Sequence, residues 1–360
     1  MTFTLSAAAT ALLATTIQVP ADHATIAAGL AAATAGDTVR VAAATWTERN
    51  LWIPDGVVLE GATGDPADVI FDGGGLERIL VAQGVGAATE IRAITFRNGN
   101  HTGHGGAIYA SDTDVRITDC RFENNHSGNW GGAIVFQGTS SPVLDGCTFL
   151  GNDALYGGAV FCELGSPQVL DCRFEDNTAT HSGGGMQAWY PASFPVLERC
   201  VFYNNRVIQF RGGGFAVEYG TAQVTSCTFV ANDGGNGEGA AIGVTSGVLT
   251  LDRSVLVGNV RALDAVSCTG GSVLTVTCTD IFGNGPGDWI GCLTGLDGTA
   301  GNFSADPLFC DPGTGDVTLQ SDSPCAPGAG NCGLIGAGAV TCQPTSVAEA
   351  SWGEIKARWR

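Results

Sequence analysis

A repeat of 25–28 residues constrains the fold of this chain more than any other feature. Its first signature is Phe-x-x-Asn, with degenerate copies at Leu256 and Ile281 and an incomplete copy at Phe96. A unit this short cannot bury a core alone, so the repeat indicates a stack of similar units rather than separate globular domains. The residues of the five full copies are Phe122, Phe149, Phe174, Phe202, Phe229, Asn125, Asn152, Asn177, Asn205 and Asn232.

Paired glycines keep the same period. They begin at Gly105, Gly131 and Gly157, with looser copies at residues 183, 212 and 239. A third apolar run lies between the two signatures, so each repeat holds three short runs separated by turn residues. Helical periodicity over segments of about ten residues is missing. The pattern predicts an all-β fold, a parallel β-helix with three short strands per coil and about ten coils.

Stacking of equivalent positions has consequences for each signature. Strands of successive coils pair at about 4.8 Å, so we expect the phenylalanines to form an internal aromatic stack. The asparagines at the strand exits are expected to adopt left-handed backbone angles and to hydrogen-bond within their turns. The paired glycines are expected to allow a sharp bend with positive φ.

A cysteine lies two residues before each of these phenylalanines and faces inward with it. Metal or redox chemistry is one interpretation; small apolar filler of a narrow core is the favoured one. In-register cysteines would place their Cβ atoms about 4.8 Å apart, beyond the separation of about 3.8 Å in a relaxed disulfide. These thiols are therefore predicted to be buried and reduced. They belong to Cys120, Cys147, Cys172, Cys200 and Cys227.

Charge and composition limit the partners of the chain. Asp and Glu number 35 against 16 Lys and Arg, which gives a formal net charge of −19, and Lys356 is the sole lysine. Such a surface repels phosphates and anionic lipid heads, so no nucleic-acid partner is expected. With 54 glycines among 360 residues and 14% charged residues, the chain is no helical bundle. No segment is long and apolar enough to span a membrane.

The two ends depart from the repeat. Residues 1–16 are either a signal-like leader without a basic start or a disordered leader. Within a β-helix over 17–301, residues 22–35 are predicted to form a short capping helix with Asp22 as its N-cap. The first strands are expected near 38–42, 57–61, 69–73 and 79–82. Residues 302–343 predict an irregular, disulfide-stapled C-terminal cap, and 344–360 form a tail whose role stays open.

Cysteine usage indicates an oxidising compartment. Five cysteines between 292 and 342 have irregular spacing without CxxC, which favours disulfides over zinc. The total of 13 is odd, and the pairing cannot be deduced; Cys332–Cys342 and Cys310–Cys325 are only the shortest closures. We expect an extracellular or cell-surface protein that is a monomer.

These motifs resemble the pectin-lyase-like right-handed parallel β-helix superfamily. The paired-glycine and Phe-x-x-Asn signatures resemble the repeat of chlamydial polymorphic outer-membrane proteins, most closely over 96–260 and more loosely over 17–343. The resemblance implies a right-handed solenoid and a bacterial, secreted context. It leaves activity open, because the superfamily includes lyases, glycoside hydrolases, esterases, epimerases, phage tailspikes and adhesins.

An enzyme of this superfamily that acts on uronate chains would need an arginine or lysine base, or paired carboxylates. Nothing in the sequence marks such a cluster, and solvated surface charges are the simpler interpretation. No metal site is predicted, although a structural or substrate-bridging Ca²⁺ on the oxygen-rich segment 232–238 remains an alternative. The catalytic candidates, with no role assigned, are Arg206, Arg211, Asp153, Glu163 and Glu218.

Aromatic side chains near the long turns support a binding role. If Ile108, Ile134, Val160 and Met186 face inward, the next residues face outward in a row that could stack on sugar rings. The alternative is that these aromatics pack under their own turns. The ligand-binding candidates are Tyr109, Trp130, Tyr156, Phe161, His181, Gln187, Trp189 and Tyr190.

The sequence thus predicts a secreted or surface β-helix protein that presents a face to a polysaccharide, a surface glycan or a cell-surface protein. A polysaccharide-active enzyme and a passive structural rod are the two alternatives.

Overall fold

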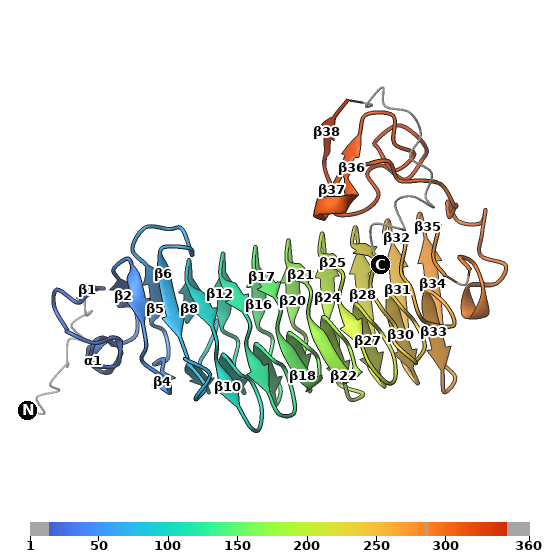
Figure 1. Cartoon of the computed structure of the whole chain (residues 1–360). Coiled ribbons are helices and arrows are strands. Elements are labelled where there is room, and N and C mark those ends of the chain that lie inside the picture. Colours follow the sequence, from blue (N-terminus) through green and yellow to red (C-terminus); the bar gives the residue numbers. More distant parts are fainter. Residues whose placement is uncertain (1–13, 286, 344–360) are drawn as a thin grey trace, which may run out of the picture.

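A computed structural model describes residues 14–285 and 287–343. The predicted leader (residues 1–13 of it) and the tail 344–360 lie outside the described residues. The chain forms a right-handed parallel β-helix whose turns stack into one long shaft (Figure 1). No helix of the described part is long and apolar enough to cross a membrane.

Three long parallel sheets run the length of the shaft. Each coil adds one strand to a sheet, and the longest sheet has eleven strands, close to the ten or so coils predicted. Sheet A, in spatial order, consists of β1 (Thr16–Val19), β2 (Thr38–Val41), β5 (Val58–Gly61), β8 (Glu90–Arg92), β12 (Arg116–Thr118), β16 (Val143–Asp145), β20 (Gln168–Leu170), β24 (Val196–Glu198), β28 (Thr221–Thr225), β31 (Val248–Asp252) and β34 (Val273–Thr277).

Sheet B has ten strands and carries the Phe-x-x-Asn signature. Its strands are β3 (Ala44–Trp46), β6 (Val69–Asp72), β9 (Thr95–Arg97), β13 (Arg121–Glu123), β17 (Thr148–Leu150), β21 (Arg173–Glu175), β25 (Val201–Tyr203), β29 (Thr228–Val230), β32 (Val255–Val257) and β35 (Asp280–Phe282).

Sheet C has nine strands and follows the paired glycines. Its strands are β4 (Leu51–Trp52), β7 (Leu80–Gln83), β11 (Ile108–Ser111), β15 (Ile134–Gln137), β19 (Val160–Cys162), β23 (Met186–Trp189), β27 (Phe215–Glu218), β30 (Ile242–Thr245) and β33 (Val266–Thr269). A shorter sheet D lies in the turns between sheets B and C and consists of β10 (Asn100–His101), β14 (His126–Ser127), β18 (Asp153–Tyr156), β22 (Thr178–Ser182) and β26 (Arg206–Val207).

The predicted phenylalanine stack is confirmed. From Phe96 to Phe229 the rings are fully buried and follow one another at centroid distances between 4.6 and 5.3 Å, with interplanar angles of at most 9°. Because the pairing is in register, one side-chain position fills the same part of the core in turn after turn.

The asparagines form a ladder instead of adopting the expected left-handed turn conformation. The amide nitrogen of Asn152 donates to the Oδ1 of Asn177 at 2.9 Å, and each neighbouring pair repeats this bond. The left-handed angles belong to the preceding residue, such as Asn124 at φ 52° and Asn204 at φ 53°. Because that residue adopts the left-handed conformation of the turn, the asparagine side chain can point inward and form hydrogen bonds between coils.

The paired glycines bend the chain as predicted, because Gly105, Gly131 and Gly157 all have φ near +60°. The second glycine of each pair is needed for space. A Cβ on Gly132 would lie 2.2 Å from the carbonyl oxygen of Gly158, so no side chain fits there.

The cysteine ladder is buried and reduced, as predicted. Burial raises the pKa of Cys120, Cys172 and Cys227 in the ladder well above the ordinary value, and it raises the pKa of Cys162, outside the ladder, to about 12. These four thiols therefore stay protonated and unreactive at neutral pH.

Alkylation mass spectrometry tests this cysteine inventory. We expect iodoacetamide to leave the native protein unmodified, to add to seven cysteines after unfolding without reductant, and to reach all 13 after reduction. More than seven additions before reduction would contradict the three disulfides of the structure.

The capping helix is shorter than predicted and has a different N-cap. Helix α1 runs over Ile26–Ala32, and the Thr25 side chain accepts a hydrogen bond from Ala28 N. Asp22 instead accepts from the backbone of Gln18 in the preceding turn. The helix buries Ile26 and Leu30 and closes the N-terminal end of the core.

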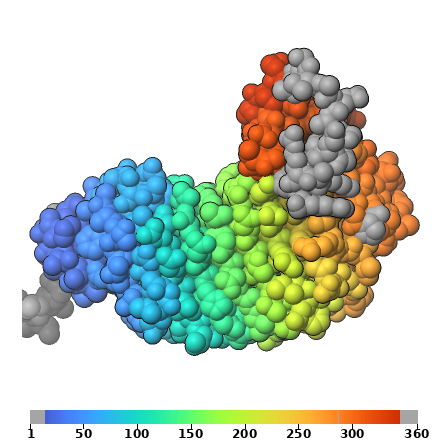
Figure 2. Space-filling model, viewed as in Figure 1, coloured from blue at the N-terminus to red at the C-terminus, as the bar shows by residue number. Residues whose placement is uncertain are grey.

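The region predicted to be a single C-terminal cap consists of two parts with different positions. Around the 3-10 helix η1 (Gly291–Leu293), Trp289, Leu293 and Leu296 pack against the main core and close its end. The segment beyond forms a lobe with β36 (Phe309–Asp311), η2 (Pro312–Thr314), β37 (Asp316–Gln320) and β38 (Val340–Cys342). The lobe stands beside the shaft rather than on its end (Figures 1 and 2).

The lobe packs on the outer face of sheet B. Val230 and Val257 of the shaft contact an apolar cluster that includes Phe309, Leu319 and Ile335 of the lobe. The shaft is apolar on this outer face, so the cysteine-rich segment covers it there.

The disulfides are Cys268–Cys292, Cys278–Cys332 and Cys310–Cys342. Neither of the two shortest closures occurs. Cys325 is a buried free thiol that faces Asp280 across the interface between lobe and shaft. Sequence distance was a poor guide because the lobe folds back on the shaft, which brings Cys332 beside Cys278.

Candidate functional site

The outer face of sheet C brings together most of the predicted ligand-binding residues. Strand register places them in three parallel rows, named here by their position along each strand. The turn row holds His104, Trp130, Tyr156, Ser182, Arg211 and Glu238. The middle row holds Val81, Tyr109, Val135, Phe161, Gln187, Ala216, Gly243 and Ser267. The exit row holds Gln83, Ser111 and Gln137, and in later turns Trp189, Glu218, Thr245 and Thr269.

The middle row points outward as predicted, but two of its candidates are covered. Phe161 and Gln187 are both 0% exposed. Trp130 of the turn row stacks on Phe161 at 4.7 Å and 13°, and Trp189 of the exit row meets the same ring edge-on at 6.0 Å. Phe161 is therefore covered rather than free for a ligand, whereas Trp130 lies over it and stays partly exposed.

Tyr156, His181 and Trp189 lie at the outer boundary of this cluster. Tyr156 stacks on His181 at 4.9 Å, and His181 on Phe210 at 5.0 Å, so these rings form a second stack along the axis. Tyr156 also contacts Trp189 at 5.4 Å. Phe210 ends the stack and is 48% exposed, which leaves free aromatic surface there.

Two tyrosines that follow the exit row have a left-handed backbone conformation. Tyr190 has φ 82° and the equivalent residue of the next turn, Tyr219, has φ 63°. In other turns this position holds Gly84, Asp112, Gly138, Ser246 and Gly270, also with positive φ. Bulky residues rarely adopt this region, and both tyrosines are exposed. We call Trp189, Tyr190, Tyr219 and Phe210 the aromatic rim.

Tyr109 lies apart from the rim. The guanidinium of Arg78 lies 4.7 Å above its ring and donates to the carbonyl of Gly105 at 3.0 Å. Burial and this guanidinium lower the pKa of His104, so its imidazole is neutral at physiological pH. Tyr109 is thus covered by a cation–π contact rather than free for a ligand.

The five catalytic candidates divide between two regions. Arg206 and Asp153 belong to sheet D, where Asp153 meets the Nδ1 of His126 at 2.6 Å and Arg206 meets Asp233 at 3.5 Å. The His126–Asp153 pair is exposed, as on a solvated surface, whereas Asp233 is buried beneath the exposed Arg206.

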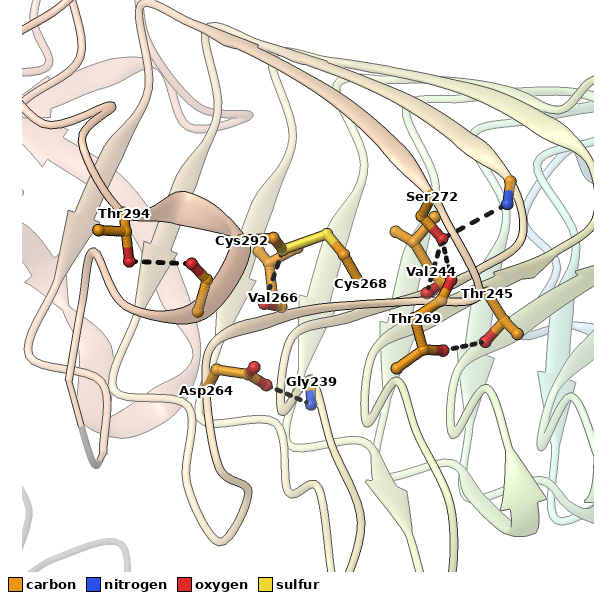
Figure 3. The surroundings of a disulfide bond; sticks show 12 residues. Gly239, Val244, Thr245, Asp264, Val266, Cys268, Thr269, Ser272, Cys292 and Thr294 are labelled. Carbon is orange, nitrogen blue, oxygen red and sulfur yellow. Dashed lines mark hydrogen bonds between the residues drawn. A yellow bond between two sulfur atoms is a disulfide. The ribbon is translucent and has the colours of Figure 1, made fainter.

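Arg211 and Glu218 lie on the sheet C face, and Glu163 follows β19 on the same side. Burial raises the pKa of Glu218, while the Arg211 charge and a hydrogen bond from Ser182 oppose that shift. Arg211 donates to the hydroxyls of Thr245 and, at 3.1 Å, Thr269, which lie side by side (Figure 3).

The oxygen-rich segment 232–238 does not converge on one point. Asn232 belongs to the buried asparagine ladder, and the carboxylate of Asp233 pairs with Arg206 and Arg261. Among the described residues, no three His, Cys, Asp or Glu side chains form a group that could hold a metal ion.

Comparison with known families decides the classification. Residues 77–256, half of the chain, match the model of the family described as the right-handed beta helix region. The chain belongs to the right-handed β-helix family. No curated protein matches it in sequence. The matched part of this β-helix includes the aromatic rim and the turns on either side of it.

Sequence reasoning missed Tyr219 as a member of the rim. The available signal was its place in the repeat, where Gly84, Gly138 and Gly270 stand in other turns. A tyrosine is unexpected at a position with positive φ. The exception can be recognised in the sequence once the repeats are aligned.

Proposed function

We propose that this β-helix protein binds a glycan on its aromatic rim. The observation that carries the proposal is a pair of exposed tyrosines in left-handed backbone conformation: Tyr190, which stacks on Trp189 at 5.3 Å, and Tyr219 at the equivalent position of the next turn. Strained conformations of this kind cluster at functional sites. Aromatic surfaces suit the apolar face of a sugar ring, and nearby polar groups suit its hydroxyls.

Location and partner class follow from the same proposal. Three disulfides are compatible with an extracellular protein, where surface glycans are available ligands. The rim belongs to a long rigid shaft, and rigid elements hold a binding surface without an entropic cost for ordering it.

Binding to a panel of soluble polysaccharides, measured by affinity electrophoresis, tests the proposal. We expect Trp189→Ala to weaken binding about tenfold, because a lost aromatic platform is worth on the order of 1 kcal/mol. Trp52→Ala is the matched control: Trp52 is 60% exposed on strand β4 of the same sheet, far along the shaft from the rim. Equal losses in both variants, or silence of the whole panel, would favour a passive rod.

Tyr219→Gly separates binding from folding. Glycine relieves the positive φ, so we expect the variant to be as stable as the parent protein or more stable by about 1 kcal/mol, yet to bind more weakly. A variant with unchanged affinity would remove Tyr219 from the site. Thermal unfolding and affinity are measured on the same preparation.

Glycan cleavage is the second candidate function, favoured by one observation. Glu218 is half-buried next to the rim, and its raised pKa suits a carboxyl that must hold a proton. Release of reducing or unsaturated ends from the same polysaccharides, lost in Glu218→Gln, would establish it.

A further inference from the structure

Unpartnered polar atoms gather on the same face of sheet C. The two side-chain polar atoms of Gln187 are buried and have no hydrogen-bond partner among the described residues, and neither do Nε of Arg211 and Oε2 of Glu238. The buried hydroxyl of Ser267 also lacks a partner there. Buried polar groups are nearly always bonded, so a series of exceptions on one face calls for a ligand or for solvent.

Strand register makes these groups neighbours. Gln187, Ala216, Gly243 and Ser267 follow one another in the middle row, one per turn, at about 4.8 Å per turn. Gly243 has no side chain, and the stem of Arg211 lies across it: a Cβ on Gly243 would be 2.9 Å from two carbons of Arg211. Donors and acceptors thus continue from the rim along the axis of the shaft.

The charges beside the rim do not suit a polyanion. Arg211 is the one guanidinium of the turn row, and its Nη1 is engaged by Thr245 and Thr269. The carboxylate of Glu238 follows Arg211 in the same row, and that of Glu218 lies in the exit row. A chain of uronates would meet at least as many carboxylates as guanidinium groups, within a protein of net charge −19.

We propose that the ligand is an electrically neutral glycan chain that lies parallel to the axis of the β-helix. Its rings contact the aromatic rim, and its hydroxyls bond to Arg211, Glu238 and Gln187. This inference rests on the proposed function and specifies its ligand class. Sugar hydroxyls both donate and accept, which matches an array that holds an arginine donor, a carboxylate acceptor and an amide with both roles. Gln187 is 0% exposed, so a ligand reaches its amide only when a neighbouring side chain moves.

The test compares neutral and anionic chains on the full-length protein. Glucan, mannan and xylan are the neutral probes, and pectate and alginate are the anionic ones, each at low and high salt. We expect a neutral chain to bind with little dependence on salt, because hydrogen bonds and ring contacts carry no net charge. Preferential binding of pectate or alginate that salt abolishes would overturn the ligand class and leave the proposed function standing. Silence of every glycan would instead overturn the proposed function.

Two substitutions test the polar array. We expect Arg211→Gln to weaken binding of the neutral chain about tenfold, and Gln187→Leu to weaken it while leaving the fold at least as stable, because the amide has no internal partner. Gln168→Leu, on sheet A, is the control and should leave affinity unchanged. If Gln187→Leu changes stability but not affinity, Gln187 contacts solvent only and the array is not part of the site.

Discussion

Asn177→Ala is expected to lower the free energy of unfolding by about 3–5 kcal/mol. The Asn177 amide donates to Phe149 O at 3.0 Å and to Asn205 Oδ1 at 2.9 Å, and its oxygen accepts from the backbone and side-chain nitrogens of Asn152. All of these groups are buried. Alanine removes these four hydrogen bonds and takes away the acceptor of the buried backbone N–H of Asn152.

Asn204→Gly is the matched control for the ladder. Asn204 is an exposed asparagine of the next turn with φ 53°, so glycine keeps its backbone conformation and removes no buried bond. We expect a change within about 1 kcal/mol in urea unfolding. If the two variants were equally stable, the ladder would contribute nothing beyond an ordinary turn.

Asp280→Asn is expected to stabilise the protein at pH 8 by on the order of 3–4 kcal/mol and to have little effect near pH 4. Asp280 is fully buried between shaft and lobe. Burial raises its pKa to about 7, against hydrogen bonds from Ala305 N and Cys325, with Asp288 and Asp306 adding to the rise. The amide oxygen of asparagine can still accept from Ala305 N, at 3.0 Å in the parent protein.

The direction of this pH effect follows from proton binding. The unfolded carboxyl ionises near its ordinary pKa of 3.8, whereas the folded carboxyl keeps its proton to about pH 7. Between these values unfolding releases a proton, so the stability of the parent protein falls as pH rises and levels off above pH 7. Urea unfolding at a series of pH values, without reductant, measures the difference between variant and parent.

An exposed carboxylate of the lobe provides the comparison. Asp322→Asn should leave the slope of stability against pH unchanged across the same window, since Asp322 is exposed. A parent protein with constant stability from pH 4 to pH 7 would show that Asp280 is ionised in the fold.

The sequence predicted which side of sheet C the candidate residues lie on, but it did not predict which of them are exposed. Period-two alternation placed Phe161 and Gln187 on the outer side of sheet C, and they lie there. The exposure of Phe161 depended on Trp130 and Trp189, which belong to the turns before and after it and pack against its ring. Whether an outward-facing side chain is exposed or covered depends on side chains of adjacent turns. The alternation of residues along one strand does not contain that information.

The sequence by itself determined the shaft, because an in-register solenoid repeats its contacts at the period of the sequence. Phe-x-x-Asn and the paired glycines specified the buried stack, the bend with positive φ and the reduced cysteines. Only the tertiary structure decided where the non-repeating parts lie. The lobe folds back on sheet B, and Cys278 of the shaft pairs with Cys332 of the lobe. These contacts join residues with no shared period, so their partners were set by the packing of the whole shaft.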